Sequence, residues 1–333
     1  MADSIPRNLT RPVHVGNVTI GGGAPVVVQS MTCTPTVDLG ATLEQVTKLA
    51  EAGCDVVRVS VPTKEALGSF RDICRESPVP IVADIHFDYR LALGALDAGA
   101  AKLRINPGNI GSWEKVDAII DKAGSMGAAI RIGVNAGSIE KDLLERTDLT
   151  QSEKLVSSAM RFVEHFESRG FENIVLSAKA HSVNTTIDTY RKLSHELPQI
   201  PLHLGVTEAG GIRQGTIKSS IALGSLLAEG IGDTMRVSLT ADPIEEVPVA
   251  WGILSALGLR RRGPEMISCP TCARCQVNLI DIASEVEHRL SSCAKPISVA
   301  VMGCALLFKQ GEIIRKIPED AIVDELLNEI SKL

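Results

Sequence analysis

Eight short runs rich in β-branched residues alternate with helix-forming segments along most of this chain. The runs occupy residues 24–30, 55–61, 80–85, 101–105, 129–134, 173–178, 201–206 and 233–239. Amphipathic helix patterns lie between them, for example over residues 42–52, 64–75, 89–98 and 244–257. No GxGxxG or Walker A sequence is present, which disfavours a doubly wound nucleotide-binding sheet. Eight strand–helix units are the number in a TIM barrel, so the sequence predicts an α/β chain built on a (β/α)8 barrel.

The alternation stops at the segment Leu259-Arg-Arg-Arg-Gly-Pro264, which has the composition of a linker. We therefore predict a substrate-binding barrel over residues 1–262 and a small α+β domain over residues 263–333. The second part is short for an independent hydrophobic core, so a metal centre would stabilise it. Within the barrel, the polar connection 136–151 is longer than the others. A mobile lid and an ordinary solvated connection both explain it.

Charge and composition disfavour several classes of partner. The 333 residues carry a net charge of −6 and only 3% aromatic side chains, so we expect no nucleic-acid partner. The N-terminal residues lack the apolar core of a signal peptide, and no apolar run approaches membrane-spanning length. Eight cysteines without an export signal are typical of reduced thiols. The sequence therefore predicts a cytoplasmic protein without a membrane partner.

The predicted strands end in polar residues, and in a TIM barrel these ends line the active site. The residues concerned are Arg58, Ser60, Asp84, His86, Arg104, Asn106, Arg131, Asn135, Lys179, Glu208, Arg236 and Ser238. Five of them are cations, which repel each other and lose hydration in a cleft unless an anion lies between them. Arginine forks bind phosphate oxygens bidentately, which favours a di- or polyphosphate ligand. Pairing with Asp84, Asp55 or Glu208 in a structural network is the alternative.

Three residues of this set are candidate catalytic groups, namely Asp84, His86 and Glu208. Glu208, in Val206-Thr-Glu-Ala-Gly-Gly, could accept or donate a proton or orient a substrate hydroxyl. His86 could supply a proton near neutral pH, although a single histidine is more often structural.

Cys269-Pro-Thr-Cys272 and Cys304 are the candidate metal ligands of the second domain. Three thiolates suit a [4Fe–4S] cluster that keeps one iron for a substrate or another ligand. A zinc site or structural thiols remain alternatives, although the second CxxC or histidine pair of a zinc ribbon is missing. Cys275 extends the motif to CxxCxxC, and it is either a fourth ligand or a thiol at the edge of the site.

Long motifs spread over the chain resemble one family. They are VGNVTIGGGAPVVVQSMT (15–32), DVVRVSVPT (55–63), VADIHFDYR (82–90), LRINPGNIG (103–111), IRIGVNAGS (130–138), LHLGVTEAGG (202–211), EGIGDTMRVSLTADP (229–243), CPTC (269–272) and VMGC (301–304). The sequence resembles the 4-hydroxy-3-methylbut-2-en-1-yl diphosphate synthase family of the non-mevalonate isoprenoid pathway from about Pro12 to the C-terminus. The resemblance implies a TIM barrel with a [4Fe–4S] domain in a homodimer, where each barrel mouth is capped by the partner subunit's cluster domain.

The resemblance also implies an activity and a set of site residues. The activity is reductive ring opening of 2-C-methyl-D-erythritol 2,4-cyclodiphosphate with loss of a hydroxyl, using two electrons from ferredoxin or flavodoxin. Glu208 would be the acid/base residue, and Cys269, Cys272 and Cys304 would hold the cluster. The diphosphate would be bound by Arg58, Arg104, Asn106, Arg131, Asn135, Lys179, Arg236 and Ser238.

The sequence departs from the family's pattern after Cys304. The family continues with an Asn-Gly-Pro-Gly-Glu-Ala-type segment, whose glutamate is the fourth protein ligand, whereas here Cys304 is followed directly by Ala305-Leu-Leu-Phe-Lys. Glu312 is a poor substitute. A deletion explains this, and so does a Gly-rich loop left out of the sequence; the intact flanking motifs favour the loop.

Two further functions remain open on the residues alone. One is a zinc-stapled TIM-barrel enzyme that acts on a phosphorylated or pterin-like substrate. The other is a non-catalytic metal-binding scaffold, if the segment after Cys304 is truly deleted.

Overall fold

The chain is described by a computed structural model over residues 5–273, 275, 277–290, 293, 295, 297–302, 306–309 and 312–332. It divides into two compact units, Met1–Arg260 and Arg261–Leu333. The division lies inside the Arg-rich segment that we interpreted as a linker. The predicted boundary after residue 262 and the separate roles of the two parts remain predictions.

Eight parallel strands form the sheet of the first unit, in the order β8-β7-β6-β5-β4-β3-β10-β9. A parallel bridge between Leu176 and Leu202 links the two ends of this order, so the sheet closes on itself. Each strand overlaps one of the eight predicted runs, and the predicted TIM barrel is confirmed. The strands are β3 (Val27–Met31), β4 (Val56–Ser60), β5 (Ile81–Asp84), β6 (Lys102–Ile105), β7 (Ala129–Asn135), β8 (Ile174–Lys179), β9 (His203–Leu204) and β10 (Thr234–Met235).

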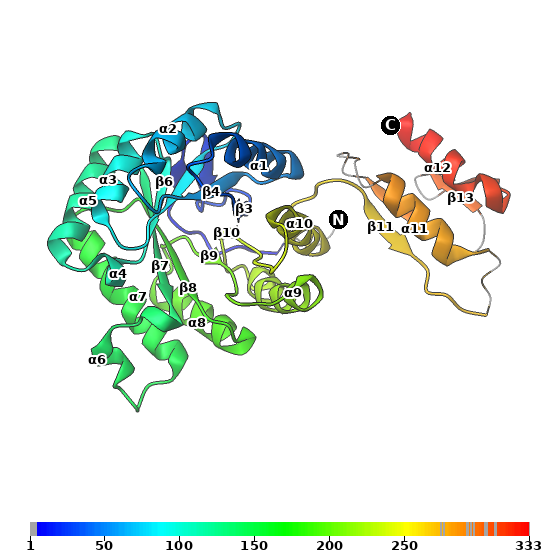
Figure 1. The fold of residues 1–333 in the computed structure, drawn as a ribbon. Coiled ribbons are helices and arrows are strands. Elements are labelled where there is room, and N and C mark those ends of the chain that lie inside the picture. Colours follow the sequence, from blue (N-terminus) through cyan, green and yellow to red (C-terminus); the bar gives the residue numbers. More distant parts are fainter. Residues whose placement is uncertain are drawn as a thin grey trace. The chain divides into compact units, whose positions relative to one another are not determined.

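Amphipathic helices cover the outside of the barrel (Figure 1). Their apolar faces pack against the outward side chains of the strands, and side-chain caps fix where several of them begin. Asp38 caps α1, and Thr150 with Glu153 forms a capping box at α7. The helices are α1 (Leu39–Ala52), α2 (Ala66–Glu76), α3 (Tyr89–Asp97), α4 (Pro107–Ile110), α5 (Trp113–Met126), α6 (Lys141–Leu144), α7 (Gln151–Ser168), α8 (Val183–Glu196), α9 (Ile212–Ala228) and α10 (Glu246–Ala256).

A hairpin of β1 (Val13–Val15) and β2 (Val18–Ile20) packs at the N-terminal ends of the barrel strands. It buries apolar side chains against residues near the start of five strands: Val27, Val56, Val82, Ala129 and Val175. The barrel therefore has an apolar floor at this end, and its polar side chains lie towards the other end of the strands.

The long connection after β7 is partly ordered by the barrel core. It contains a 3₁₀ turn, Ala136–Ser138, and the short helix α6. Ile139 and Leu143 are buried in the main hydrophobic core, which anchors the middle of the segment. Movement of this connection as a lid remains a prediction.

The second unit is a small α+β structure, as predicted. In it β11 (Glu265–Ser268) pairs in parallel with β12 (Ser298–Val301), and β13 (Leu306–Lys309) pairs antiparallel with β14 (Glu312–Lys316). The helices α11 (Leu279–Leu290) and α12 (Ile322–Ser331) contribute Val286 and Ile330 to a separate core. The last helix begins at Ile322, after a 3₁₀ turn at Glu319–Ala321 that follows Pro318. Over the residues that the structure describes, no helix is long and apolar enough to cross a membrane.

Candidate active site

Strand register brings the predicted cations together at the C-terminal end of the barrel. Asp84 of β5 lies beside Arg104 of β6, and Arg104 lies beside Arg131 of β7. Lys179 of β8 is paired with Asn135 at the end of β7. Because side chains alternate between the two faces of a strand, these residues share the inner face of the barrel.

Asp84 is the carboxylate at the centre of this group. It is buried, and it accepts hydrogen bonds from Arg104 Nη1 at 3.2 Å and from His86 Nε2 at 3.2 Å. Arg58 Nε lies 3.9 Å from Asp84 Oδ2, the same oxygen that accepts from His86. Burial raises the pKa of Asp84, but Arg58, His86 and Arg104 outweigh that effect and hold the pKa well below its usual value. Asp84 is therefore ionised, and it orients two arginines and His86.

The other cations of the group have few acceptors. Arg131 is 1% exposed, and in the described structure neither its Nε nor its Nη1 has a hydrogen-bond partner. Burial, followed by repulsion from neighbouring arginines, lowers the pKa of both Arg131 and Lys179 well below their usual values. Burial also lowers the pKa of Arg58 to about 10. Cations held this way are destabilising alone and favour an anion between them.

Arg236 differs from Arg131 and Lys179 because a carboxylate already binds it. Its Nε and Nη2 each donate to Glu246 at 3.0 Å, in a bidentate pair. Glu246 is buried at the start of α10 and also accepts from Ser30 Oγ at 2.7 Å. The structural pairing that we considered for the cations thus applies to Arg104 and Arg58, through the expected partner Asp84, and to Arg236, whose partner is Glu246. Asp55, one of the expected partners, binds Arg260 instead, at 2.6 Å.

The predicted polar ligands Asn106, Asn135 and Ser238 lie at the same strand ends. Asn106 caps α4 by accepting from Gly108 N, and it donates to Ser138 Oγ at 2.6 Å. With its amide oriented to satisfy both ends, Asn135 accepts from Arg104 Nη2 at 3.2 Å. Ser238 is half-buried. The two asparagines therefore also have structural roles, which their sequence positions did not reveal.

Glu208 is exposed and lies in a strained backbone conformation. Its φ is 55°, and it is the one non-glycine residue with positive φ in the described part of the chain. A glutamate in the left-handed region is uncommon, and such strain is often found at functional sites. His86 is also exposed, apart from its bond to Asp84. Glu208 and His86 are therefore both accessible to a ligand that enters from solvent. The buried carboxylate of Asp84 orients the His86 imidazole.

Four buried polar residues inside the barrel were missed by the sequence analysis: Gln29, Lys102, His203 and Glu246. Lys102 had a usable signal, because Lys102, Arg104 and Asn106 alternate along one strand and so share its inner face. Glu246 had none, since its position in the first turn of a helix suggests a solvated residue.

Cys269, the first of the predicted metal ligands, directly follows β11 and lies beside the end of β12. Ser268 pairs with Val301, and Cys269 N donates to Val301 O at 3.2 Å, so both chains leave the sheet at one edge. Cys269 is half-buried, Cys272 is exposed, and both are free thiols. Cys304 lies outside the described residues. Within the described ranges, no three His, Cys, Asp or Glu side chains are already grouped to hold a metal ion.

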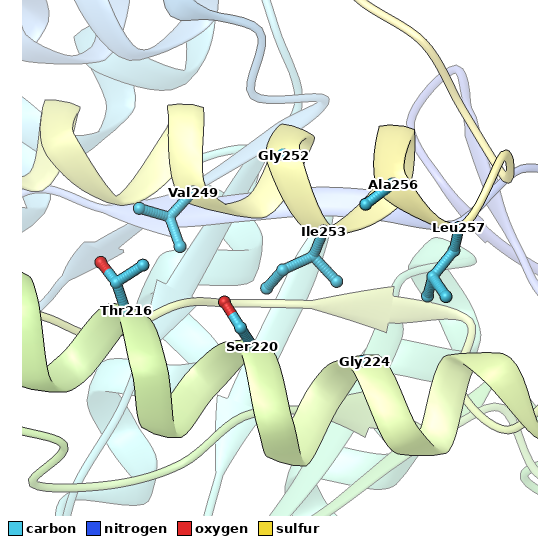
Figure 2. A pocket seen from close by; sticks show the side chains of 8 residues that line it. All are labelled: Thr216, Ser220, Gly224, Val249, Gly252, Ile253, Ala256 and Leu257. Carbon is cyan, nitrogen blue, oxygen red and sulfur yellow. The ribbon is translucent and has the colours of Figure 1, made fainter. Parts of the chain in front are cut away.

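A groove of about 320 Å³ lies between α9 and α10 on the outside of the barrel (Figure 2). Small and apolar residues line it: Thr216, Ser220, Gly224, Val249, Gly252, Ile253, Ala256 and Leu257. None of them is titratable, so this groove does not carry the chemistry of the barrel interior.

Comparison with known proteins identifies the family. The family model described as the GcpE TIM-barrel domain matches residues 10–251, and the GcpE protein C-terminal domain matches residues 265–306. The chain belongs to the GcpE family. A relative from Clostridium acetobutylicum is 51% identical over 97% of this chain and 99% of its own length. One from Bacillus velezensis is 47% identical over 100% of this chain and 94% of its own.

Both relatives are named 4-hydroxy-3-methylbut-2-en-1-yl diphosphate synthase (flavodoxin), which agrees with the resemblance seen in the sequence motifs. This GcpE-family chain is therefore an enzyme. Among solved structures, dihydropteroate synthases from Stenotrophomonas maltophilia and Coxiella burnetii match 75% of the chain. Their TM-scores are 0.56 and 0.53, at 16% and 12% sequence identity. The matches cover 98% and 100% of the two synthase chains. This likeness shows the barrel fold alone.

The GcpE-family chain is shorter than its relatives. The alignment with the Bacillus velezensis relative extends over 354 positions while covering all 333 residues here, so at least 21 positions have no counterpart in this chain. The C-terminal domain match ends at residue 306, close to Cys304. The full sequence runs without interruption from Cys304 into Ala305 and Leu306. A deletion and a loop left out of the sequence, the explanation that we favoured, both account for this shortening.

Proposed function

We propose that this enzyme catalyses the reductive ring opening and dehydroxylation of 2-C-methyl-D-erythritol 2,4-cyclodiphosphate to 4-hydroxy-3-methylbut-2-enyl diphosphate. The observation that carries the proposal is the group of buried cations with unfilled hydrogen-bond capacity at one end of the barrel. A cyclic diphosphate offers phosphoryl oxygens to several guanidinium groups at once, which a singly charged ligand cannot.

Arg58, Arg104, Arg131 and Lys179 would bind the diphosphate directly. Arg131 has the largest unfilled capacity, with two guanidinium nitrogens that lack an acceptor in the described structure. Asn106, Asn135, Arg236 and Ser238 would complete the contacts at the strand ends. Because Nε and Nη2 of Arg236 already donate to Glu246, we expect Arg236 to contribute less than Arg131 to diphosphate binding.

Proton transfer is assigned to the exposed groups at the mouth. The reaction consumes electrons and releases a hydroxyl group as water, so a proton must reach the departing oxygen. Glu208 and His86 are accessible from solvent, and Asp84 fixes the orientation of the imidazole through the 3.2 Å hydrogen bond. We propose that Glu208 moves the proton beside the substrate and that Asp84 and His86 position the reacting hydroxyl.

Cys269, Cys272 and Cys304 would hold a [4Fe–4S] cluster. The donor set fits, because Cys269 and Cys272 are free thiols, which suit iron, and Cys269 directly follows β11 beside the end of β12. When bound, such a cluster supplies electrons and a Lewis-acidic iron for cleavage of the C–O bond. The sequence given contains no equivalent of the glutamate that the resemblance implies as a fourth ligand, and a site with three protein ligands is the expectation for this chain.

We also propose that flavodoxin donates the electrons, as the names of the relatives state for those proteins, and that the enzyme is a cytoplasmic homodimer. Sedimentation at several protein concentrations would test the dimer.

Anaerobic purification followed by iron and sulfide analysis tests the proposal. We expect brown protein with about four irons per chain, whose colour bleaches with dithionite and which then converts the cyclodiphosphate. Colourless protein with stoichiometric zinc would instead indicate the zinc-stapled enzyme. Metal-free protein that binds no diphosphate would indicate a scaffold without catalysis.

A further inference from the structure

A second layer of polar side chains lies beneath the cations that would bind the diphosphate. Lys102 precedes Arg104 by one inward-facing position on β6, and its neighbours across the sheet are Val82 and Ala129 of the apolar floor. Its exposure is 0%. In the described structure Lys102 Nζ has no hydrogen-bond partner, and neither does Gln29 Nε2 or His203 Nε2.

The charges inside the barrel do not balance. The buried and half-buried cations of the inner face are Arg58, Lys102, Arg104, Arg131, Lys179 and Arg236. The carboxylates among the buried residues that touch them are Asp84 and Glu246. Without a bound anion, these cations would outnumber the carboxylates by six to two if every one were charged. A closed sheet cannot relieve this by moving the side chains into water.

Lysine is the residue type that can remove a charge, because an arginine side chain stays protonated in proteins. Both lysines are buried, but Lys179 lies at the strand ends with 7% of its surface exposed, whereas Lys102 lies one layer deeper with 0% exposed. Burial, followed by repulsion from Arg131 and Arg58, lowers the pKa of Lys102 well below its usual value. The charged and titratable groups that face Lys102 are Arg131 on β7, Arg58 on β4 and His203 on β9. None is an anion.

We propose that Lys102 is an uncharged amine in the free enzyme and takes up a proton from solvent when a diphosphate anion binds above it. The arriving anion offsets the repulsion that keeps the amine neutral, so the site gains positive charge only when it is needed. Ring opening adds a terminal phosphate charge, which the protonated amine would partly balance, and the proton returns to solvent when the product leaves. Lys102 is then a positioning residue, and this role rests on the proposed diphosphate site.

Titration calorimetry with inorganic sulfate tests the proposal. Sulfate is a dianion that binds no proton near neutral pH, so any proton taken up belongs to the protein. The enzyme is titrated at about pH 7 in two buffers with different protonation enthalpies, and the difference in heat gives the number of protons bound. We expect about one proton per sulfate for the wild type and about none for Lys102→Met. The matched control Lys48→Met removes an exposed lysine of α1 and should behave as the wild type.

The wild type alone also tests the inference, in case Lys102→Met does not fold. Because binding is coupled to proton uptake, the sulfate affinity should fall as the pH rises, by up to about tenfold per pH unit. Sulfate binding without proton uptake would overturn the role of Lys102 and leave the proposed function intact. Uptake that persists in Lys102→Met would assign the proton to another group, such as Lys179 or His203. Absence of sulfate binding by the wild type would overturn both the anion site and this inference.

Discussion

The barrel interior and the cysteine segment prepare for their ligands in opposite ways. In the barrel, strand register places Arg104 beside Arg131, and Arg58 shares the carboxylate of Asp84 with Arg104 without any bound anion. In the second unit, Cys269 and Cys272 follow strand β11. The thiol of Cys269 is half-buried, and that of Cys272 is exposed. No three metal-binding side chains are grouped in the part of the chain that is described.

This difference has an energetic consequence. Buried cations without acceptors destabilise the folded protein, so the barrel must obtain its stability from its apolar floor and helices. Thiols near the surface have little such effect, but their site forms only when the metal binds. Ligand removal should therefore leave the barrel site in place and disorganise the cysteine site.

The largest expected effect is that of Cys272→Ser. Loss of one thiolate should remove the iron–sulfur centre and all reductive turnover, because the site has few other ligands to retain the metal. Iron and sulfide per chain and the visible absorption of anaerobic protein measure this.

Cys74→Ser on α2 is the matched control, since it removes a half-buried thiol of the barrel unit. It should keep full iron content. Retention of iron and turnover in Cys272→Ser would contradict the assignment of the ligands.

Asp84→Asn should destabilise the free protein by about 3 kcal/mol near neutral pH, because it leaves buried Arg104 and Arg58 without their carboxylate. The pKa of Asp84 is held below its usual value, so its contribution is present above about pH 4 and is lost as the pH falls further. The wild type should therefore lose stability on acidification more steeply than Asp84→Asn, as denaturant titrations at several pH values would show.

Asp38→Asn is the control for this prediction, because asparagine keeps the cap of α1 and the acid sensitivity of the rest of the protein. Equal pH dependence of Asp84→Asn and the wild type would mean that Asp84 is not the ion-pair centre of the barrel.

The smallest expected effect is that of Cys275→Ser. Cys275 Sγ donates to Val277 O at 3.2 Å, and the side chain packs against the core of the second unit. We therefore expect unchanged iron content and a loss of stability within about 1 kcal/mol. Loss of iron from this variant would show that the cysteine site uses a third thiol of the CxxCxxC motif.

The sequence predicted the barrel site better than the contacts within it. Period-two alternation and the ends of parallel strands were enough to collect Arg58, Arg104, Arg131 and Lys179, because a closed sheet leaves few other arrangements. The partner of Arg236 could not be predicted, since Glu246 reaches it from a helix that follows the strand.

The same limit applies to the second unit. The small α+β domain was predicted, whereas its strand β11 was not recognised. Its parallel pairing with β12 joins residues distant in sequence, and local propensity carries no information on such contacts. That pairing nevertheless places Cys269 beside the end of β12.

The central claim is that the barrel cations are arranged to bind an anion. When no anion is bound, the same cations lower the stability of the folded protein. Arg131→Met tests it most directly, with the unfolding midpoint of the free protein and the affinity for the cyclodiphosphate measured side by side. We predict a midpoint raised by about 3 °C and an affinity lowered about 100-fold, or about 2.7 kcal/mol. A lowered midpoint with unchanged affinity would contradict the account and identify Arg131 as part of a structural network.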